Sequence, residues 1–268
     1  MSWPALEGLA DRHEVTLYGP DALRPFWDGG PWRPPATMPR GEYDAAVLFA
    51  PSFRAAWEAR LVPRRIGTPT DHRRWLLTEA VAPRAHRSDT YRAVAGRLGA
   101  SHPAPPRLRG PPAAGGPAHV GLNPIVKGGR TRQWTGFAAL ADVLARRFPV
   151  RFYAGPGEGR ALAAVAPRHP QSVGLPLRSF AAALGDCRVF VSNDAGSAHF
   201  AAALGVRVVV LYGSTRPEHT GPAGAWAVQG PSLPCVPCYR NRCRIRTFGC
   251  LDIALNDVVA AVEAAWDS

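Results

Sequence analysis

The stretch that decides the fold is "VFVSNDAGSAHFAAALGVRVVVLYGSTRPEHTGPAG", residues 189–224. Two apolar runs flank an alanine-rich segment, and a short polar turn with a glycine separates the first run from that segment. Runs that are apolar throughout are typical of parallel strands buried on both faces, whereas the alanine-rich segment has the length of a helix. The stretch therefore predicts strand, helix and strand, with Asn193 to His199 at the first turn of the helix.

The same alternation continues on both sides of this stretch. Apolar runs predict further strands at 118–124 and 150–155, and amphipathic segments predict helices at 136–148, 179–187 and 254–266. Buried strands separated by helices indicate a parallel sheet that is covered on both faces, with right-handed crossovers. The sequence predicts an α/β, Rossmann-like domain whose ligand crevice lies at the carboxyl ends of the strands.

A segment rich in proline and glycine separates two parts of the chain. They are dense over 103–117, where no apolar period persists, so this segment is predicted to be a linker. Residues 1–102 hold shorter apolar runs that end at Gly or Pro, which predicts an incomplete N-terminal α/β domain. Residues 118–268 form the predicted C-terminal domain.

The composition is that of a globular protein, with 46% hydrophobic and 19% charged residues. The sequence has no uninterrupted apolar run of spanning length and no secretory signal, so we expect a cytoplasmic protein. A net charge of +12 favours an anionic partner, although scattered arginines also reflect a GC-rich genome. Nucleic acid is disfavoured, because no basic run carries interleaved aromatic residues.

The turn at 193–199 has the chemistry of a phosphate site. We expect Asp194 to cap the helix, which leaves the backbone N–H groups of residues 195–197 directed out of its positive end. Gly196 would permit a diphosphate to approach closely, and His199 could donate to a phosphate oxygen. Local chemistry alone fits an ordinary capped helix with a structural histidine equally well.

The wider context adds a family resemblance. "NDAGSAHFAAALGVRVVVLYGSTRPEHTGPAG" resembles the signature region of glycosyltransferase family 9, the lipopolysaccharide heptosyltransferases. "GLNPIVKGGRTRQWTGFAALADVL" is similar to the family's strand, basic loop and Trp-bearing helix start, and the resemblance extends over most of the chain. It implies a GT-B architecture of two Rossmann-like domains facing a cleft, with an ADP-heptose donor held by the C-terminal domain.

The resemblance also implies roles for individual residues. Asp194 would hold a sugar hydroxyl, His199 a phosphate oxygen, and Lys127, the only lysine, would neutralise the leaving diphosphate. Ordinary alternatives stay open: a solvated loop lysine, a first-turn glutamate at Glu158, and a plain turn at Ser214 and Thr215. The remaining expected donor contacts are the ribose-binding carboxylate Glu158, the backbone of Ala195 and Gly196, and Asn193, Ser197, Ser214 and Thr215.

The opening motif of the family has no counterpart at the start of this sequence. The family opens with a strand and a Gly-Asp turn whose Asp acts as general base, whereas "WPALEGLADRHEVTLYG" matches the helix and strand after that turn. Two interpretations stay open. Met1 is an internal methionine of a longer reading frame, or the chain is shortened and lacks both a strand and its proton acceptor.

Cysteine spacing suggests a metal site. Four of the five cysteines form C-x2-C-x4-C-x6-C, which in a reducing compartment favours a tetrahedral structural zinc over disulfides. Reduced thiols packed in a loop and an iron–sulfur cluster are the alternatives, and Cys187 is expected to be a small core residue. The candidate ligands are Cys235, Cys238, Cys243 and Cys250.

The function that these expectations favour is an inverting sugar transfer from an ADP-sugar to a glycolipid acceptor of the lipopolysaccharide-core type. No cofactor is required for the transfer itself, and a peripheral contact with the inner membrane is expected. The first alternative is a nucleotide-sugar-binding protein that lacks the general base. A zinc-dependent nucleic-acid-binding module is a third possibility, and it rests on the Cys/Arg segment alone.

Overall fold

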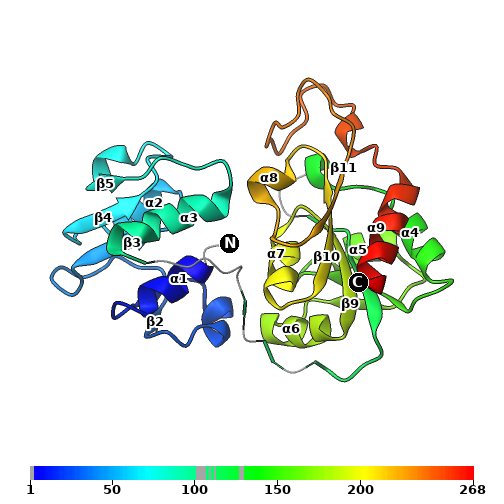
Figure 1. The fold of residues 1–268 in the computed structure, drawn as a ribbon, viewed down its shortest axis with the longest axis horizontal. Coiled ribbons are helices and arrows are strands. Elements are labelled where there is room, and N and C mark those ends of the chain that lie inside the picture. The colour runs from blue at the N-terminus through cyan, green and yellow to red at the C-terminus, as the bar shows by residue number, and fades with distance from the viewer. Residues whose placement is uncertain (1–2, 101–106, 109, 112, 127–129) are drawn as a thin grey trace. The chain divides into compact units, whose positions relative to one another are not determined.

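The structure is a computed structural model that describes residues 3–100, 107, 108, 110, 111, 113–126 and 130–268. The chain divides into two units, residues 1–106 and 107–268 (Figure 1). This division falls inside the predicted linker 103–117. Every sheet is built from parallel strands, and helices connect them, which confirms the predicted α/β class. Within the described residues, no helix has the length and apolar character needed to cross a membrane.

The C-terminal unit holds one six-stranded parallel sheet in the order β11-β10-β9-β6-β7-β8. Its strands are β6 (His119–Asn123), β7 (Val150–Ala154), β8 (Gln171–Val173), β9 (Cys187–Asn193), β10 (Arg207–Tyr212) and β11 (Trp226–Gln229). Its helices are η4 (Arg130–Arg132), α4 (Phe137–Leu144), α5 (Gly159–Val165), α6 (Leu177–Gly185), α7 (Gly196–Ala203), α8 (Pro217–Thr220), η5 (Gly249–Leu251) and α9 (Leu255–Asp267).

Alternating side chains of this sheet enter two apolar cores. Val189 and Val191 of β9 pack with α4, α5 and α9 on one face, while Phe190 packs with α6 and α7 on the other. Figure 1 shows α9 and α4 together on one side of the strands. Because the central strands are buried on both faces, they are apolar throughout, and this is the pattern from which the sequence predicted them.

Helix α7 has a defined end. Leu204 is its C-cap, and Gly205 follows at φ +84°, in the left-handed region that favours glycine. The N–H of Val206 donates to the carbonyl of Ala201 at 3.1 Å, and that of Gly205 to the carbonyl of Ala202 at 3.0 Å. This Schellman pair satisfies the last carbonyls of α7 and directs the chain into β10.

The N-terminal unit holds two separate parallel sheets, one of β1 and β2 and one in the order β3-β4-β5. Its strands are β1 (Leu17–Tyr18), β2 (Trp32–Arg33), β3 (Ala45–Leu48), β4 (Arg64–Gly67) and β5 (Glu79–Ala80). Its helices are α1 (Trp3–Ala10), η1 (Asp21–Phe26), α2 (Phe53–Glu58), η2 (Arg74–Leu76), α3 (Arg87–Ala95) and η3 (Gly96–Leu98).

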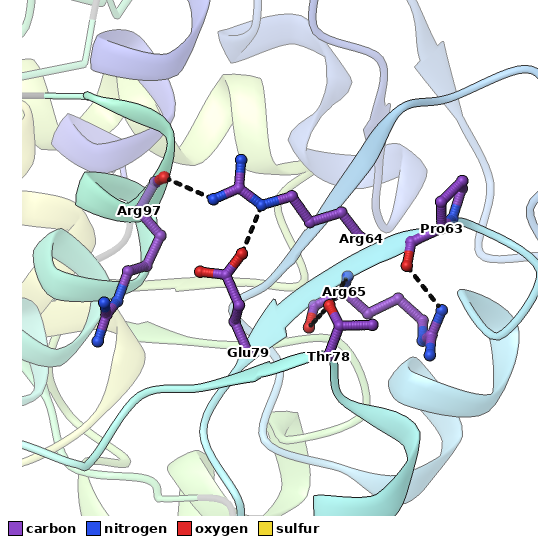
Figure 2. A network of polar contacts seen from close by, with 6 residues as sticks. All are labelled: Pro63, Arg64, Arg65, Thr78, Glu79 and Arg97. Carbon is purple, nitrogen blue, oxygen red and sulfur yellow. Dashed lines mark hydrogen bonds and ion pairs between the residues drawn. The ribbon is translucent and has the colours of Figure 1, made fainter.

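Polar contacts supplement the small cores of this unit. Arg64 of β4 pairs with Glu79 of β5 at 2.5 Å and donates to the carbonyl of Arg97 at 3.0 Å (Figure 2). Next to this pair, Thr78 Oγ1 accepts from the N–H of Arg65 at 2.7 Å. These bonds join β4 to β5 and to the segment after α3, at the amino end of the short strands.

Candidate functional site

The strand order of the C-terminal unit places a crevice at the carboxyl ends of β6 and β9. The chain runs from β6 to β7 and β8 on one side, and then crosses to β9, β10 and β11 on the other. Ligands of open α/β sheets bind at such a switch point, outside the carboxyl ends of the strands. The expected donor-binding residues of the described chain lie at the end of β9, in the turn and first part of α7 that follow it, and in the loops after β7 and β10.

Two buried asparagines hold this edge together. Asn193 is fully buried, and its amide donates to the carbonyl of Pro124 at 2.9 Å and accepts from the N–H of Trp134 at 3.0 Å. Asn123, at the end of β6, donates to the carbonyl of Tyr153 at 2.9 Å and accepts from Ser197 Oγ at 3.0 Å. Both side chains bond to protein groups, so they position the surrounding loops.

The capping role expected of Asp194 was wrong. Ala195 is the N-cap of α7, in extended backbone, and makes no side-chain capping bond. The side chain of Asp194 accepts from Thr220 Oγ1 of α8 at 3.1 Å and is 5% exposed. A carboxylate fixed in this way, with its second oxygen available for further hydrogen bonds, suits a role in orienting a ligand hydroxyl.

The opening of α7 is accessible. Gly196 is exposed, and a Cβ built at this position would meet no heavy atom within 4 Å. Its backbone and that of Ser197 occupy the first helical positions, whose N–H groups have no intrahelical partner. Ser197 Oγ also lies 3.1 Å from Ser192 Oγ, while His199 is half-buried one turn further along. The helix therefore presents N–H groups and a histidine beside open space.

Two buried hydroxyl groups after β10 lack a described partner. Ser214 and Thr215 are each 1% exposed, and neither Ser214 Oγ nor Thr215 Oγ1 has a hydrogen-bond partner within the described part of the chain. Burying an unpaired hydroxyl is costly, so such groups commonly bind a ligand or an ordered water. Tyr212 OH also has no hydrogen-bond partner among the described residues. Burial, and to a smaller extent the negative charge of nearby Asp194, raises the pKa of this phenol.

Glu158 lies after β7 with one carboxylate oxygen already engaged. Glu158 Oε2 accepts from the N–H of Gly155 at 2.7 Å, which closes the turn before α5. Glu158 is also the N-cap residue of α5, although its side chain makes no bond to that helix. The carboxylate is thus held at the carboxyl edge of β7, and this position is compatible with either a structural turn or ribose binding.

The cysteine segment, residues 235–250, is hydrogen-bonded to the loop that follows β10. The N–H groups of Cys238 and Tyr239 both donate to the carbonyl of Ser214, at 3.0 and 3.2 Å, and Thr131 Oγ1 donates to the carbonyl of Arg240 at 2.6 Å. The phenol of Tyr239 hydrogen-bonds His219 Nδ1 of α8. This segment is therefore attached to the loop that carries Ser214, to η4, and to helix α8, which carries Thr220.

All four cysteines of the segment line one cavity of about 340 Å³, together with Ser214. Burial, and then the proximity of the other three thiols, raises the pKa of Cys250. Even so, among the described residues no group of three or more His, Cys, Asp or Glu side chains is arranged to hold a metal ion. The zinc interpretation therefore stays a prediction. Cys187 is buried in the core beside α6, as expected.

The sequence did not predict two of the site residues, and one residue that it did predict cannot be placed. Lys127 lies outside the described residues. Thr220 was missed, although Pro217 at the first helical position of α8 indicates a helix that carries Thr220 one turn later. Tyr239 was missed because its φ of +52° and its contact with His219 depend on the conformation of the cysteine segment.

Comparison with known proteins fits this geometry. The family model described as glycosyltransferase family 9 (heptosyltransferase) matches residues 116–248. Over these residues the chain is similar to glycosyltransferase family 9. The matched residues include β6 to β11, the turn at Asp194 and most of the cysteine segment, which confirms the resemblance found in the sequence.

Individual relatives show the extent of the similarity. Lipopolysaccharide heptosyltransferase 1 of Pseudomonas aeruginosa is 40% identical over 82 residues, which is 30% of this chain and 21% of that protein. The alignment thus spans about a fifth of the relative's length.

Two solved structures cover nearly the whole chain. E. coli ADP-heptose lipopolysaccharide heptosyltransferase II matches with a TM-score of 0.75 at 21% identity, over 99% of this chain and 94% of that one. E. coli heptosyltransferase WaaC with ADP matches with a TM-score of 0.72 at 15% identity, over 98% and 95%. At these identities the likeness shows the fold alone, and it confirms the GT-B class for the chain.

Proposed function

We propose that the chain is an inverting glycosyltransferase that moves a heptose, or a related sugar, from an ADP-sugar to a glycolipid acceptor of the lipopolysaccharide-core type. The observation that carries this proposal is the carboxyl edge of β9 and β10. The first N–H groups of α7, the held carboxylate of Asp194, and the hydroxyls of Ser214 and Thr215, which have no hydrogen-bond partner among the described residues, lie there. The match of residues 116–248 to the family 9 model supports the reaction class.

The donor diphosphate would lie against the start of α7. The N–H groups of Gly196 and Ser197, with the positive end of the helix dipole, would bind phosphate oxygens, and the open space over Gly196 admits them. His199, one turn along, would donate to a phosphate oxygen. Asp194 would accept a hydrogen bond from a sugar hydroxyl, which orients the anomeric carbon.

Transfer would then be a single in-line displacement. The acceptor hydroxyl oxygen bonds to the anomeric carbon while the bond from that carbon to the phosphate oxygen breaks, so the configuration inverts. The negative charge that develops on the departing ADP is stabilised by the α7 amides and His199. We expect Lys127 to add positive charge there. The acceptor proton passes to a general base that we have not identified among the described residues.

The decisive experiment compares donor binding with turnover. Titration calorimetry with an ADP-sugar should show binding to the parent chain and weaker binding, by roughly tenfold or more, in Asp194→Ala. Glu263→Ala, which removes a half-buried carboxylate of α9 that pairs with Arg147 away from the carboxyl ends of the strands, is the control and should bind as the parent does. Equal donor affinity in Asp194→Ala and the parent would overturn the proposed site.

The second candidate is a nucleotide-sugar-binding protein that does not transfer. The observation that favours it is that no general base was identified among the described residues. Incubation with ADP-heptose and a core glycolipid separates the two: release of ADP with extension of the acceptor supports transfer, whereas donor binding without either product supports the binding protein.

The cysteine segment carries a separate prediction of a structural zinc. Metal analysis of protein purified without chelator should find about one zinc per chain, as four thiolates favour. Cys243→Ser should lower this content, whereas Cys187→Ser, in the core, should retain it. Protein without bound metal, or equal content in both variants, would contradict the prediction and favour reduced thiols.

A further inference from the structure

An aromatic side chain of the cysteine segment, Tyr239, is paired with His219 of α8, and the proposed transfer reaction does not use either of them. The phenol of Tyr239 is hydrogen-bonded to His219 Nδ1. The two rings also stack, with centroids 5.8 Å apart and an angle of 28° between their planes. A hydrogen bond and a ring contact with the same partner fix the direction of the Tyr239 side chain.

Both the side chain and the backbone of Tyr239 are attached to elements that hold Asp194. His219 directly precedes Thr220, whose hydroxyl donates to Asp194 Oδ2 at 3.1 Å. The N–H of Tyr239 donates to the carbonyl of Ser214 at 3.2 Å. Ser214 follows β10, whose penultimate carbonyl accepts from the N–H of Asp194 at 3.1 Å. The ring of Tyr239 is therefore held near the Asp194 carboxylate from two directions.

The conformation of Tyr239 is unusual for an aromatic residue. Its φ is +52°, in the left-handed region that favours glycine, and such a conformation persists where the surrounding contacts impose it. Here the N–H of Cys238 donates to the same Ser214 carbonyl at 3.0 Å and reinforces the attachment. Even so, Tyr239 is 39% exposed. Because His219 stacks on one face of the ring, the accessible part of the ring includes the other face.

We propose that Tyr239 binds the sugar ring of the donor, with its free aromatic face against the C–H groups of the pyranose. This binding mode rests on the proposed function, in which Asp194 accepts a hydrogen bond from a sugar hydroxyl. A pyranose carries its hydroxyls around the rim and C–H groups on its faces, and the negative face of an aromatic ring attracts such C–H groups. Ligand pockets commonly combine an aromatic wall with a few polar groups that fix orientation.

The two parts of the donor are then bound by different groups of the protein. The diphosphate lies against the first N–H groups of α7, whereas Tyr239 contacts only the sugar. The affinity for ADP should therefore be independent of Tyr239, and the affinity for an ADP-sugar should depend on it. This difference separates a sugar contact from a general effect on the shape of the site.

Calorimetry with ADP and with ADP-heptose, both without acceptor, tests the proposal. In Tyr239→Ala the affinity for ADP-heptose should fall roughly fivefold or more, while the affinity for ADP is unchanged. Tyr239→Phe retains the aromatic ring and should retain most of the affinity for ADP-heptose. Ile245→Ala, which truncates an exposed side chain of the same cysteine segment, is the control and should bind both ligands as the parent does. Circular dichroism and thermal unfolding establish that each variant is folded.

Three results would overturn the proposal. If the parent binds both ligands and Tyr239→Ala binds ADP-heptose equally well, the sugar contact is wrong and the proposed donor site stands. If Tyr239→Ala loses affinity for ADP and ADP-heptose to the same extent, Tyr239 maintains the shape of the whole site and does not contact the sugar. If the parent binds neither ligand, the proposed function is wrong, and the sugar contact with it.

Discussion

The two units of the chain differ in how their parallel strands are joined. In the C-terminal unit six strands form one continuous sheet, with β7 and β8 on one side of β6 and β9, β10 and β11 on the other. In the N-terminal unit the described strands form two separate sheets, one of β1 and β2 and one of β3, β4 and β5.

A continuous sheet supports a site by holding residues of neighbouring strands at one edge. In the C-terminal unit, neighbouring strands β6 and β9 bring Asn123, Asn193 and Asp194 to one edge, where buried hydrogen bonds fix them. In the N-terminal unit the buried side chain of Arg73 donates to carbonyls of the loops after β3 and β4, while the bond from Thr70 Oγ1 to the carbonyl of Pro51 is exposed. We therefore expect the N-terminal unit to be the less stable of the two and the more sensitive to loss of one side chain.

The largest effect is expected from Arg73→Met. Methionine fills similar space but donates no hydrogen bond, so the carbonyls of Ala50, Ser52 and Thr68 lose their partner in a buried site. The N-terminal unit should lose roughly 2–4 kcal/mol of unfolding free energy. Urea unfolding with hydrogen exchange will show whether β3 and β4 lose protection while β9 and β10 keep it.

Arg74→Met is the control for this change, because Arg74 is the exposed neighbour of Arg73. It should alter stability by less than about 0.5 kcal/mol. If Arg73→Met lowered protection equally in both units, the units would unfold together and the comparison between them would fail.

A smaller effect is expected at the helix ends. Gly205→Ala places a side chain at φ +84° after α7 and should cost about 1 kcal/mol in the C-terminal unit. Gly96→Ala, at the C-cap of α3 with φ −60°, should be neutral or slightly stabilising. Thermal unfolding of both variants measures the contrast. Equal loss of stability in the two variants would mean that glycine is no more important at the Schellman end of α7 than at the end of α3.

The smallest effect is expected from Glu79→Gln in the network of Figure 2. The hydrogen bond and charge of Arg64 hold the pKa of Glu79 below its usual value. A carboxylate with a lowered folded-state pKa stabilises the fold above its unfolded-state pKa, and this stabilisation disappears as pH falls through the folded-state value. The small difference in unfolding midpoint between parent and variant should therefore be present at pH 7 and vanish in acid. A difference that grew in acid would contradict this sign.

The sequence predicted the C-terminal unit better than the N-terminal unit for a physical reason. Strands buried on both faces, such as β9 and β10, are apolar at every position and leave an unmistakable pattern. Strands of two residues, such as β1 and β5, carry too few side chains to show any period.

Sequence also located the candidate site but not its internal bonds. The polar turn after β9 was visible as a break between apolar runs, so Asp194 and Gly196 could be singled out. The bond from Thr220 to Asp194 and the burial of Ser214 and Thr215 depend on contacts between segments that are apart in the sequence, and no local pattern encodes them. For this reason the capping role was assigned to Asp194 when Ala195 takes it.

The most direct test of the proposed donor site is the affinity of ADP for Gly196→Leu. A Cβ at this position would meet no heavy atom within 4 Å, so we expect the fold to be retained, while the leucine side chain would occupy the space in which we place the diphosphate. Gly96→Leu, at an equally open position of the N-terminal unit, is the matched control. Calorimetry should find ADP binding lost in Gly196→Leu and unchanged in Gly96→Leu. Parent-like ADP affinity in a folded Gly196→Leu would contradict a nucleotide site at the start of α7.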